Sequence, residues 1–157
     1  MNEKAGAHCG DTPTTRCVFY RSCGLAAVVQ PETERIVVAA GPHLGAVTMP
    51  AELGAAARRS LLGRGVLSGP VISHPRSGRW TFLIAPDIPD ETTLFAEMFR
   101  LNVSVVRSGT IVLPSPSRRS EAFRTWVTQP RVTGTQPSGM ALVAAIRECS
   151  VGRESRS

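Results

Sequence analysis

Short apolar runs separated by polar links that contain Gly or Pro divide this chain into strands and helices. Seven of these runs are bounded by turn residues and predict short strands. The first six form three successive pairs, each joined by a short link, and we expect each pair to be a hairpin. The predicted strands are residues 34–41, 45–49, 70–73, 80–85, 103–106, 110–113 and 124–128.

Three segments show helical spacing of apolar residues. Pro50 opens the first, which ends near Gly63, and proline is tolerated at a first helical turn because its missing N–H is unpaired there. Asp90 is expected to cap the second, which runs over residues 91–101. Ser138 is expected to cap the third, over residues 138–149.

Strand pairs with helices between them favour an α+β domain. We expect a mixed or antiparallel sheet of about six or seven strands with about three helices, within a single domain over residues 17–149. The apolar segment 17–29 has no clear period and is expected to pack on that domain. The polar ends, residues 1–16 and 150–157, are expected to be disordered tails.

Composition narrows the class of protein. The chain has 157 residues, of which 42% are hydrophobic, as in globular domains. No apolar run reaches the roughly 18 residues that cross a bilayer, and the N-terminus lacks the apolar region of a secretory signal. We therefore expect a cytoplasmic protein with no membrane partner.

The charge is strongly basic. The formal net charge is +6, and of 18 cationic residues only Lys4 is a lysine, so 17 are arginines. A GC-rich coding sequence accounts for the arginine excess but not for the net charge. A basic surface attracts polyanions, so nucleic acid is the first partner to consider.

Residues for covalent or metal chemistry are sparse. The three histidines lie in no recognisable nucleophile motif. The gaps between Cys9, Cys17 and Cys23 exceed the usual two to four residues of zinc ligands. Asp87, Asp90 and Glu91 cluster after the central hairpin, but they also suit a loop and a helix cap. We expect no catalytic residue, no metal site and no cofactor.

Two basic turns remain as candidate sites. Arginines, small hydroxyl residues and backbone amides together form cradles for phosphate oxygens. Each turn is also followed by a tryptophan, Trp80 or Trp126, whose indole could stack on a base or pack in the core. The candidate nucleic-acid or phosphate-binding residues are His74, Arg76, Ser77, Gly78, Arg79 and Trp80 in the first turn, and Ser115, Arg118, Arg119 and Arg124 in the second.

The same two turns carry a resemblance to a known family. "GPVISHPRSGRWTFLIAPD" and "RSGTIVLPSPSRRSEAFRTWV" resemble two linked blocks of the primase-polymerase domains of actinobacterial, plasmid and phage replication proteins. The resemblance covers residues 45–130. It implies a primase-polymerase-like fold in a shortened, degenerate member of the family, with nucleic acid or nucleotide as ligand and a replication or transcription protein as partner.

The sequence departs from the family pattern at the positions of the family's metal-binding and nucleotide-binding residues. The family's metal-binding acids correspond to Thr48 and Ser104 or their neighbours, and its nucleotide-binding histidine corresponds to Trp80. Without acids, two divalent ions cannot be held. The resemblance therefore implies a catalytically inactive domain that binds phosphate through its basic loops. Two alternatives stay open: an active nucleotidyltransferase that uses unaligned acids such as Asp87 or Asp90, and an accessory protein that binds another protein.

Overall fold

The computed structural model describes residues 12–116, 124–132 and 136–156. They form an α+β fold with four helices and two antiparallel sheets, of three and five strands. The helices are α2 (Pro13–Ser22), α3 (Ala51–Gly63), α4 (Thr92–Arg100) and α6 (Gly139–Arg156). The strands are β1 (Val28–Val29), β2 (Ile36–Ala40), β3 (Gly45–Pro50), β4 (Val71–His74), β5 (Arg79–Ile84), β6 (Ser104–Val106), β7 (Gly109–Leu113) and β8 (Thr125–Thr128).

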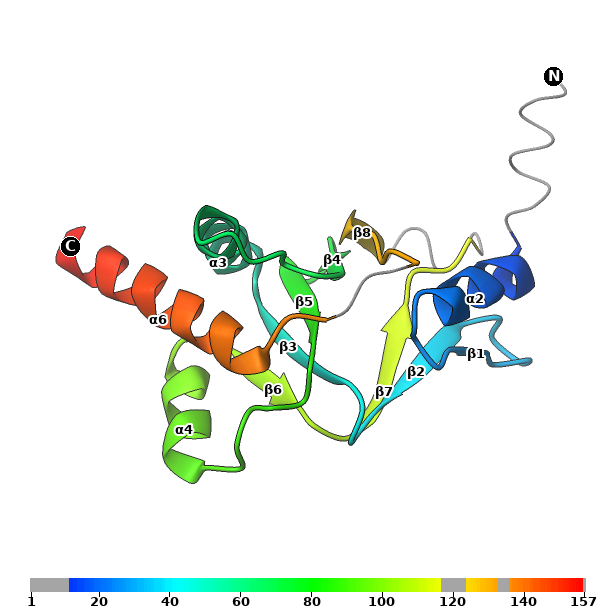
Figure 1. The fold of residues 1–157 in the computed structure, drawn as a ribbon, viewed down its shortest axis with the longest axis horizontal. Coiled ribbons are helices and arrows are strands. Elements are labelled where there is room, and N and C mark those ends of the chain that lie inside the picture. The colour runs from blue at the N-terminus through cyan, green and yellow to red at the C-terminus, as the bar shows by residue number, and fades with distance from the viewer. Residues whose placement is uncertain (1–11, 117–123, 133–135, 157) are drawn as a thin grey trace, which may run out of the picture.

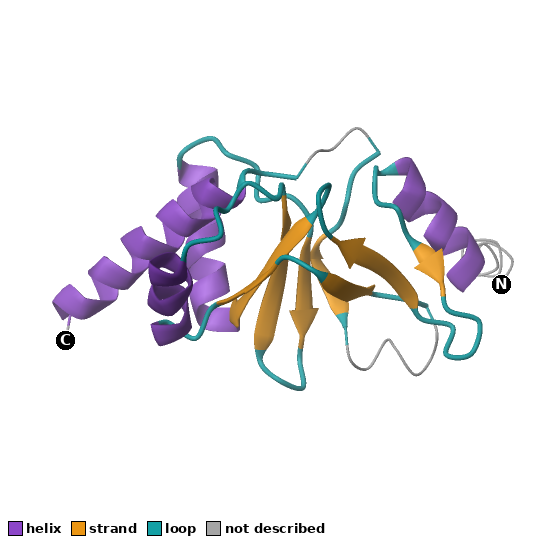
Figure 2. Ribbon diagram, turned by 90° about the horizontal axis from the view of Figure 1, so that it is seen from below, coloured by secondary structure: helices purple, strands orange, loops and turns teal. Residues whose placement is uncertain are grey.

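The two sheets divide the apolar residues into two cores. The five-stranded sheet has the order β6-β3-β5-β4-β8, and the three-stranded sheet has the order β1-β2-β7. One core lies between the larger sheet and helices α3, α4 and α6, while the other lies between the two sheets and α2 (Figures 1 and 2). The strands β3 and β5 therefore have both faces covered, which explains their nearly unbroken apolar runs.

One predicted hairpin is confirmed and two are wrong. β4 and β5 pair as expected. β2, however, pairs with β7 rather than β3, and β6 pairs with β3 rather than β7. Each short link, residues 41–44 and 107–108, carries the chain from one sheet to the other (Figure 1). Because these strands lack a strict polar alternation, the sequence pattern fits either set of partners.

The predicted single sheet is also wrong, and so are some element ends. α2 begins at Pro13, within the expected tail, and the side chain and backbone of its cap residue Thr12 exchange hydrogen bonds with those of Thr15 (2.8 and 3.1 Å). The last helix continues to Arg156, although we expected it to end at Cys149. Residues 1–11 and 157 of the predicted tails lie outside the described residues.

Helix starts follow the sequence closely. Ser138 caps α6 as predicted, since its Oγ accepts from the amide of Ala141 (3.3 Å). α4 begins one residue later than expected, with Glu91 and not Asp90 at the cap position.

An ion pair joins the last two helices. Arg147 on α6 donates two hydrogen bonds to Glu97 on α4 (2.7 and 2.8 Å).

Candidate functional site

The first basic turn joins β4 to β5 and is anchored to the start of α3. The amides of Ser77 and Gly78 donate to the carbonyl of His74 (3.2 and 2.9 Å). Gly78 has φ +69°, a left-handed conformation that glycine adopts without a Cβ penalty. Its carbonyl accepts from the amide of Ala51, the first residue of α3 (2.9 Å). The turn therefore holds a fixed position relative to both strands and helix.

Alternation along β5 sends its side chains to opposite faces of the sheet. Trp80 and Phe82 pack in the core beneath the helices. Arg79 and Thr81 face the other way, toward the space between the two sheets. The guanidinium of Arg79 donates to Thr48 Oγ1 and to the carbonyl of Asn102, both at 3.0 Å. These bonds hold the Arg79 cation across strands β5, β3 and the loop before β6.

His74 lies beside this arginine at the end of β4. Its Nε2 is 2.7 Å from Thr81 Oγ1, within hydrogen-bond distance, and Thr81 is itself buried. Burial lowers the pKa of His74, and the positive charges of Arg124 and Arg79 lower it further. His74 is therefore neutral at neutral pH, and its protonation depends on whether negative charge enters this space.

Arg124, just before β8, completes the group of cations. Its Nε is buried and has no hydrogen-bond partner among the described residues. Burial lowers the pKa of Arg124, as does the charge of Arg35, but an arginine remains charged at neutral pH. A buried donor without a partner costs about 1–3 kcal/mol, so an acceptor bound here would relieve that cost.

These side chains line a cleft between the two sheets, which we call the inter-sheet cleft. It has a volume of about 290 Å³, and none of the described residues that line it carries a carboxylate. The polar lining consists of Thr48, His74, Ser77, Arg79, Thr81, Thr110 and Arg124. Such a set offers hydrogen-bond donors and positive charge to an anion.

The cleft brings together only part of the predicted site. His74, Ser77, Arg79 and Arg124 line it. Arg76 is exposed on the turn and Gly78 contributes backbone geometry. Ser115 is buried away from the cleft lining, where its hydroxyl donates to the carbonyl of Glu34 (3.3 Å). Arg118 and Arg119 lie outside the described residues.

Both tryptophans pack inside the protein rather than in the cleft. Trp80 lies against α3 so closely that a Cβ added to Gly54 would come within 2.9 Å of its ring. Trp126 donates from Nε1 to the hydroxyl of Tyr20 (2.8 Å), which in turn donates to the carbonyl of Pro114 (2.6 Å). Neither indole is placed to stack on a base in the cleft.

The acidic candidates have structural contacts. Asp87 accepts hydrogen bonds from the amides of Gly139 and Met140 (2.6 and 3.2 Å), so it caps α6. Asp90 forms an ion pair with Arg107 (3.3 Å). Cys17 and Cys23 are buried free thiols. Within the described part of the chain, no three His, Cys, Asp or Glu side chains are grouped so that they could hold a metal ion.

Sequence reasoning overlooked the polar residues that hold the cations. Thr81 lies in a run that predicts an apolar strand, and the role of the Asn102 carbonyl has no sequence signal. Thr48 and Ser104, where the resemblance would place acids, pair with one another on β3 and β6. Thr48 lines the cleft, and Trp80 faces away from it.

Comparisons of the chain with protein-family models, with curated proteins and with solved structures find no match. The resemblance to primase-polymerase domains therefore rests on the two sequence blocks alone. Among the described residues, no helix has the length and apolar character that crossing a membrane requires.

Proposed function

We propose that this chain is a catalytically inactive, primase-polymerase-like domain that binds phosphate groups of nucleic acid or nucleotides in the inter-sheet cleft. The observation that carries the proposal is the convergence of Arg79, His74 and Arg124 on a cleft with no acid among its described lining residues. A phosphate has several acceptor oxygens, and arginine binds it through parallel N–H donors.

The contacts of the cleft favour an anion over a metal ion. The Arg79 guanidinium bonds to Thr48, one of the positions at which the family resemblance implies an acid. A cation there would be repelled by Arg79, whereas a phosphate oxygen would be attracted by Arg79 and Arg124. Arg124, which also lines the cleft, supplies further N–H donors through its guanidinium. The geometry thus suits binding of an anion better than two-metal nucleotidyl transfer.

Salt-dependent binding of a labelled single-stranded oligodeoxynucleotide tests this proposal. Fluorescence anisotropy is measured for the wild type and for Arg124→Met and Arg79→Met, which keep much of the side-chain volume. Each variant should weaken binding about tenfold and reduce the salt slope by about 1. Arg59→Met is the matched control, because Arg59 is exposed on α3, which covers the opposite face of the sheet.

Two results would overturn the proposal. One is a wild-type protein that does not bind the oligonucleotide or a nucleotide at low salt. The other is an equal loss of binding in Arg59→Met, which would indicate a diffuse charge effect. Template-directed primer synthesis by the pure protein with Mg²⁺ or Mn²⁺ would instead overturn the proposal that the domain is catalytically inactive. It would favour the alternative of an active nucleotidyltransferase.

A further inference from the structure

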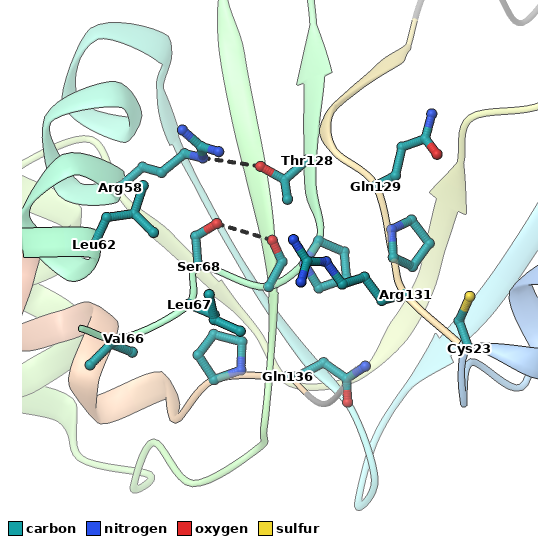
Figure 3. A pocket seen from close by; sticks show the side chains of 14 residues that line it. Cys23, Arg58, Leu62, Val66, Leu67, Ser68, Thr128, Gln129, Arg131 and Gln136 are labelled. Carbon is teal, nitrogen blue, oxygen red and sulfur yellow. Dashed lines mark hydrogen bonds between the residues drawn. The ribbon is translucent and has the colours of Figure 1, made fainter. Parts of the chain in front are cut away.

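A second, larger cavity lies near the start of β4 and the end of β8, and nothing in the proposed function uses it. It has a volume of about 450 Å³, within the range of small-molecule sites. Its walls are the second half of α3, residues 66–70, Thr128 at the end of β8 with residues 129–131 after it, residues 136–137 before α6, and Cys23 after α2 (Figure 3). We call it the α3 cavity.

The α3 cavity is largely apolar. Leucines, a valine and prolines form its apolar side: Leu62, Val66, Leu67, Pro70, Pro130 and Pro137. Leu67 is 65% exposed and Leu62 is 42% exposed, although both are large hydrophobic residues. An apolar group placed against them would remove that surface from water, which is favourable.

Two arginines give the same cavity a positive charge. Arg58 extends from α3, and its Nε donates to Thr128 Oγ1 (3.0 Å), which fixes the direction of its guanidinium. Arg131 reaches toward the middle of the cavity from the opposite wall (Figure 3). Among the described residues that line the cavity none is acidic, and no described carboxylate pairs with either arginine.

We infer that the α3 cavity binds an amphipathic organic anion, with its charged head at Arg58 and Arg131 and its apolar body against Leu62 and Leu67. An inorganic anion is too small to fill this volume and would leave the leucines exposed. A neutral hydrocarbon would offer no negative charge to the two guanidinium groups. A ligand with an anionic head and an apolar body pairs with the arginines and also covers the leucines.

Octanoate is the probe for this inference, and its binding is followed by ¹H–¹⁵N amide shifts. It should bind saturably with one site, and the shifts should be confined to residues of the cavity walls. Arg131→Met should weaken binding about tenfold, since a charge-assisted hydrogen bond is lost. Octan-1-ol, which has the same tail without the charge, should bind about tenfold more weakly than octanoate, for the same reason.

Control variants separate this site from the inter-sheet cleft. Arg131 is exposed, so Arg131→Met keeps the test valid even if Arg58→Met loses stability with its Thr128 bond. Arg79→Met and Arg59→Met should leave octanoate binding unchanged. Equal binding of octan-1-ol, an equal loss in Arg59→Met, or no saturable shift at the cavity with octanoate would each overturn the inference.

Discussion

The described linings of the inter-sheet cleft and the α3 cavity each contain two arginines and no acid, yet the residues beside those arginines differ. In the cleft, Arg79 and Arg124 are accompanied by His74, by the hydroxyl groups of two neighbouring strands and by apolar side chains of both sheets. In the cavity, leucines and prolines surround Arg58 and Arg131. Positive charge alone therefore does not decide the ligand, and the neighbouring residues decide which kind of anion fits.

The two sites also hold their arginines differently. Arg79 donates to two acceptors, one of them a backbone carbonyl, and Arg124 has a buried Nε. Arg58 donates to one threonine, and Arg131 is exposed. Preorganised donors suit a small, highly charged group such as phosphate, because little conformational entropy remains to be lost on binding. The looser pair suits a ligand whose affinity comes partly from its apolar body.

Charge reversal in the cleft should give the largest effect and separate the two sites. In the double variant Arg79→Glu/Arg124→Glu, oligonucleotide binding should fall by about a hundredfold or more, because two charge-assisted contacts become repulsive. Octanoate binding should be unchanged. Anisotropy and amide-shift titrations on the same preparation measure both ligands.

The reverse variant completes that experiment. Arg58→Glu/Arg131→Glu should abolish octanoate binding and leave most oligonucleotide binding, with the small loss expected of a lower net charge. If either double variant removed both activities while circular dichroism showed a folded protein, the two sites would not be independent and the comparison would fail.

The sequence was sufficient for the parts of the fold that depend on local signals. Turn, proline and capping residues that lie close together in the chain predict the β4–β5 hairpin, the start of α3 after Pro50 and the cap of α6 by Ser138. Strand partners across the two links were wrong because pairing depends on which sheet covers which face. That choice is made by tertiary packing, which short apolar runs do not encode.

The candidate site was predictable in the same partial way. Arg79 and His74 were identified because their turn is basic and local. The cleft itself requires β3, β5 and β8 to lie in one sheet, which no local pattern shows. Trp80 was placed in the site because of its position in the turn, but alternation along β5 turns it into the core.

A second prediction asks whether Trp126 belongs to the core or to a binding surface. Tyr20→Phe removes the hydroxyl that accepts from Trp126 and donates to Pro114. Because this group is fully buried, the free energy of unfolding should fall by about 1–3 kcal/mol. Oligonucleotide and octanoate binding should both be unchanged at a temperature where the variant is folded. Urea unfolding measures the difference.

Trp126→Phe provides the matched partner in a double-mutant cycle. Its cost should be non-additive with that of Tyr20→Phe, since the two variants break one shared hydrogen bond. A Trp126→Phe protein with wild-type stability and weakened oligonucleotide binding would show that the indole contacts the ligand, and would enlarge the cleft site beyond its present residues.

The smallest expected effect is a pH dependence that belongs to the cleft alone. The pKa of His74 lies below its ordinary value of 6.5, because of burial and then the charges of Arg124 and Arg79. A bound anion offsets those charges and favours the protonated imidazole, so binding takes up a proton. Sulfate, which stays doubly charged, should bind about threefold to tenfold more tightly at about pH 5.5 than at about pH 7.5.

The same shift fixes the sign of the stability change without ligand. As pH falls below 6.5, the unfolded chain binds a proton at His74 before the folded protein does. The free energy of unfolding should therefore decrease from neutral pH toward acid, and sulfate should reverse part of that loss.

The variant His74→Gln tests both effects. The part of the acid-induced loss of stability that is due to His74 should disappear, and so should the pH dependence of sulfate binding. Octanoate binding in the α3 cavity, whose described lining residues include no histidine, should stay constant over about pH 6–8, where a carboxylate remains ionised. A pH-independent sulfate affinity in the wild type would mean that His74 does not face the bound anion.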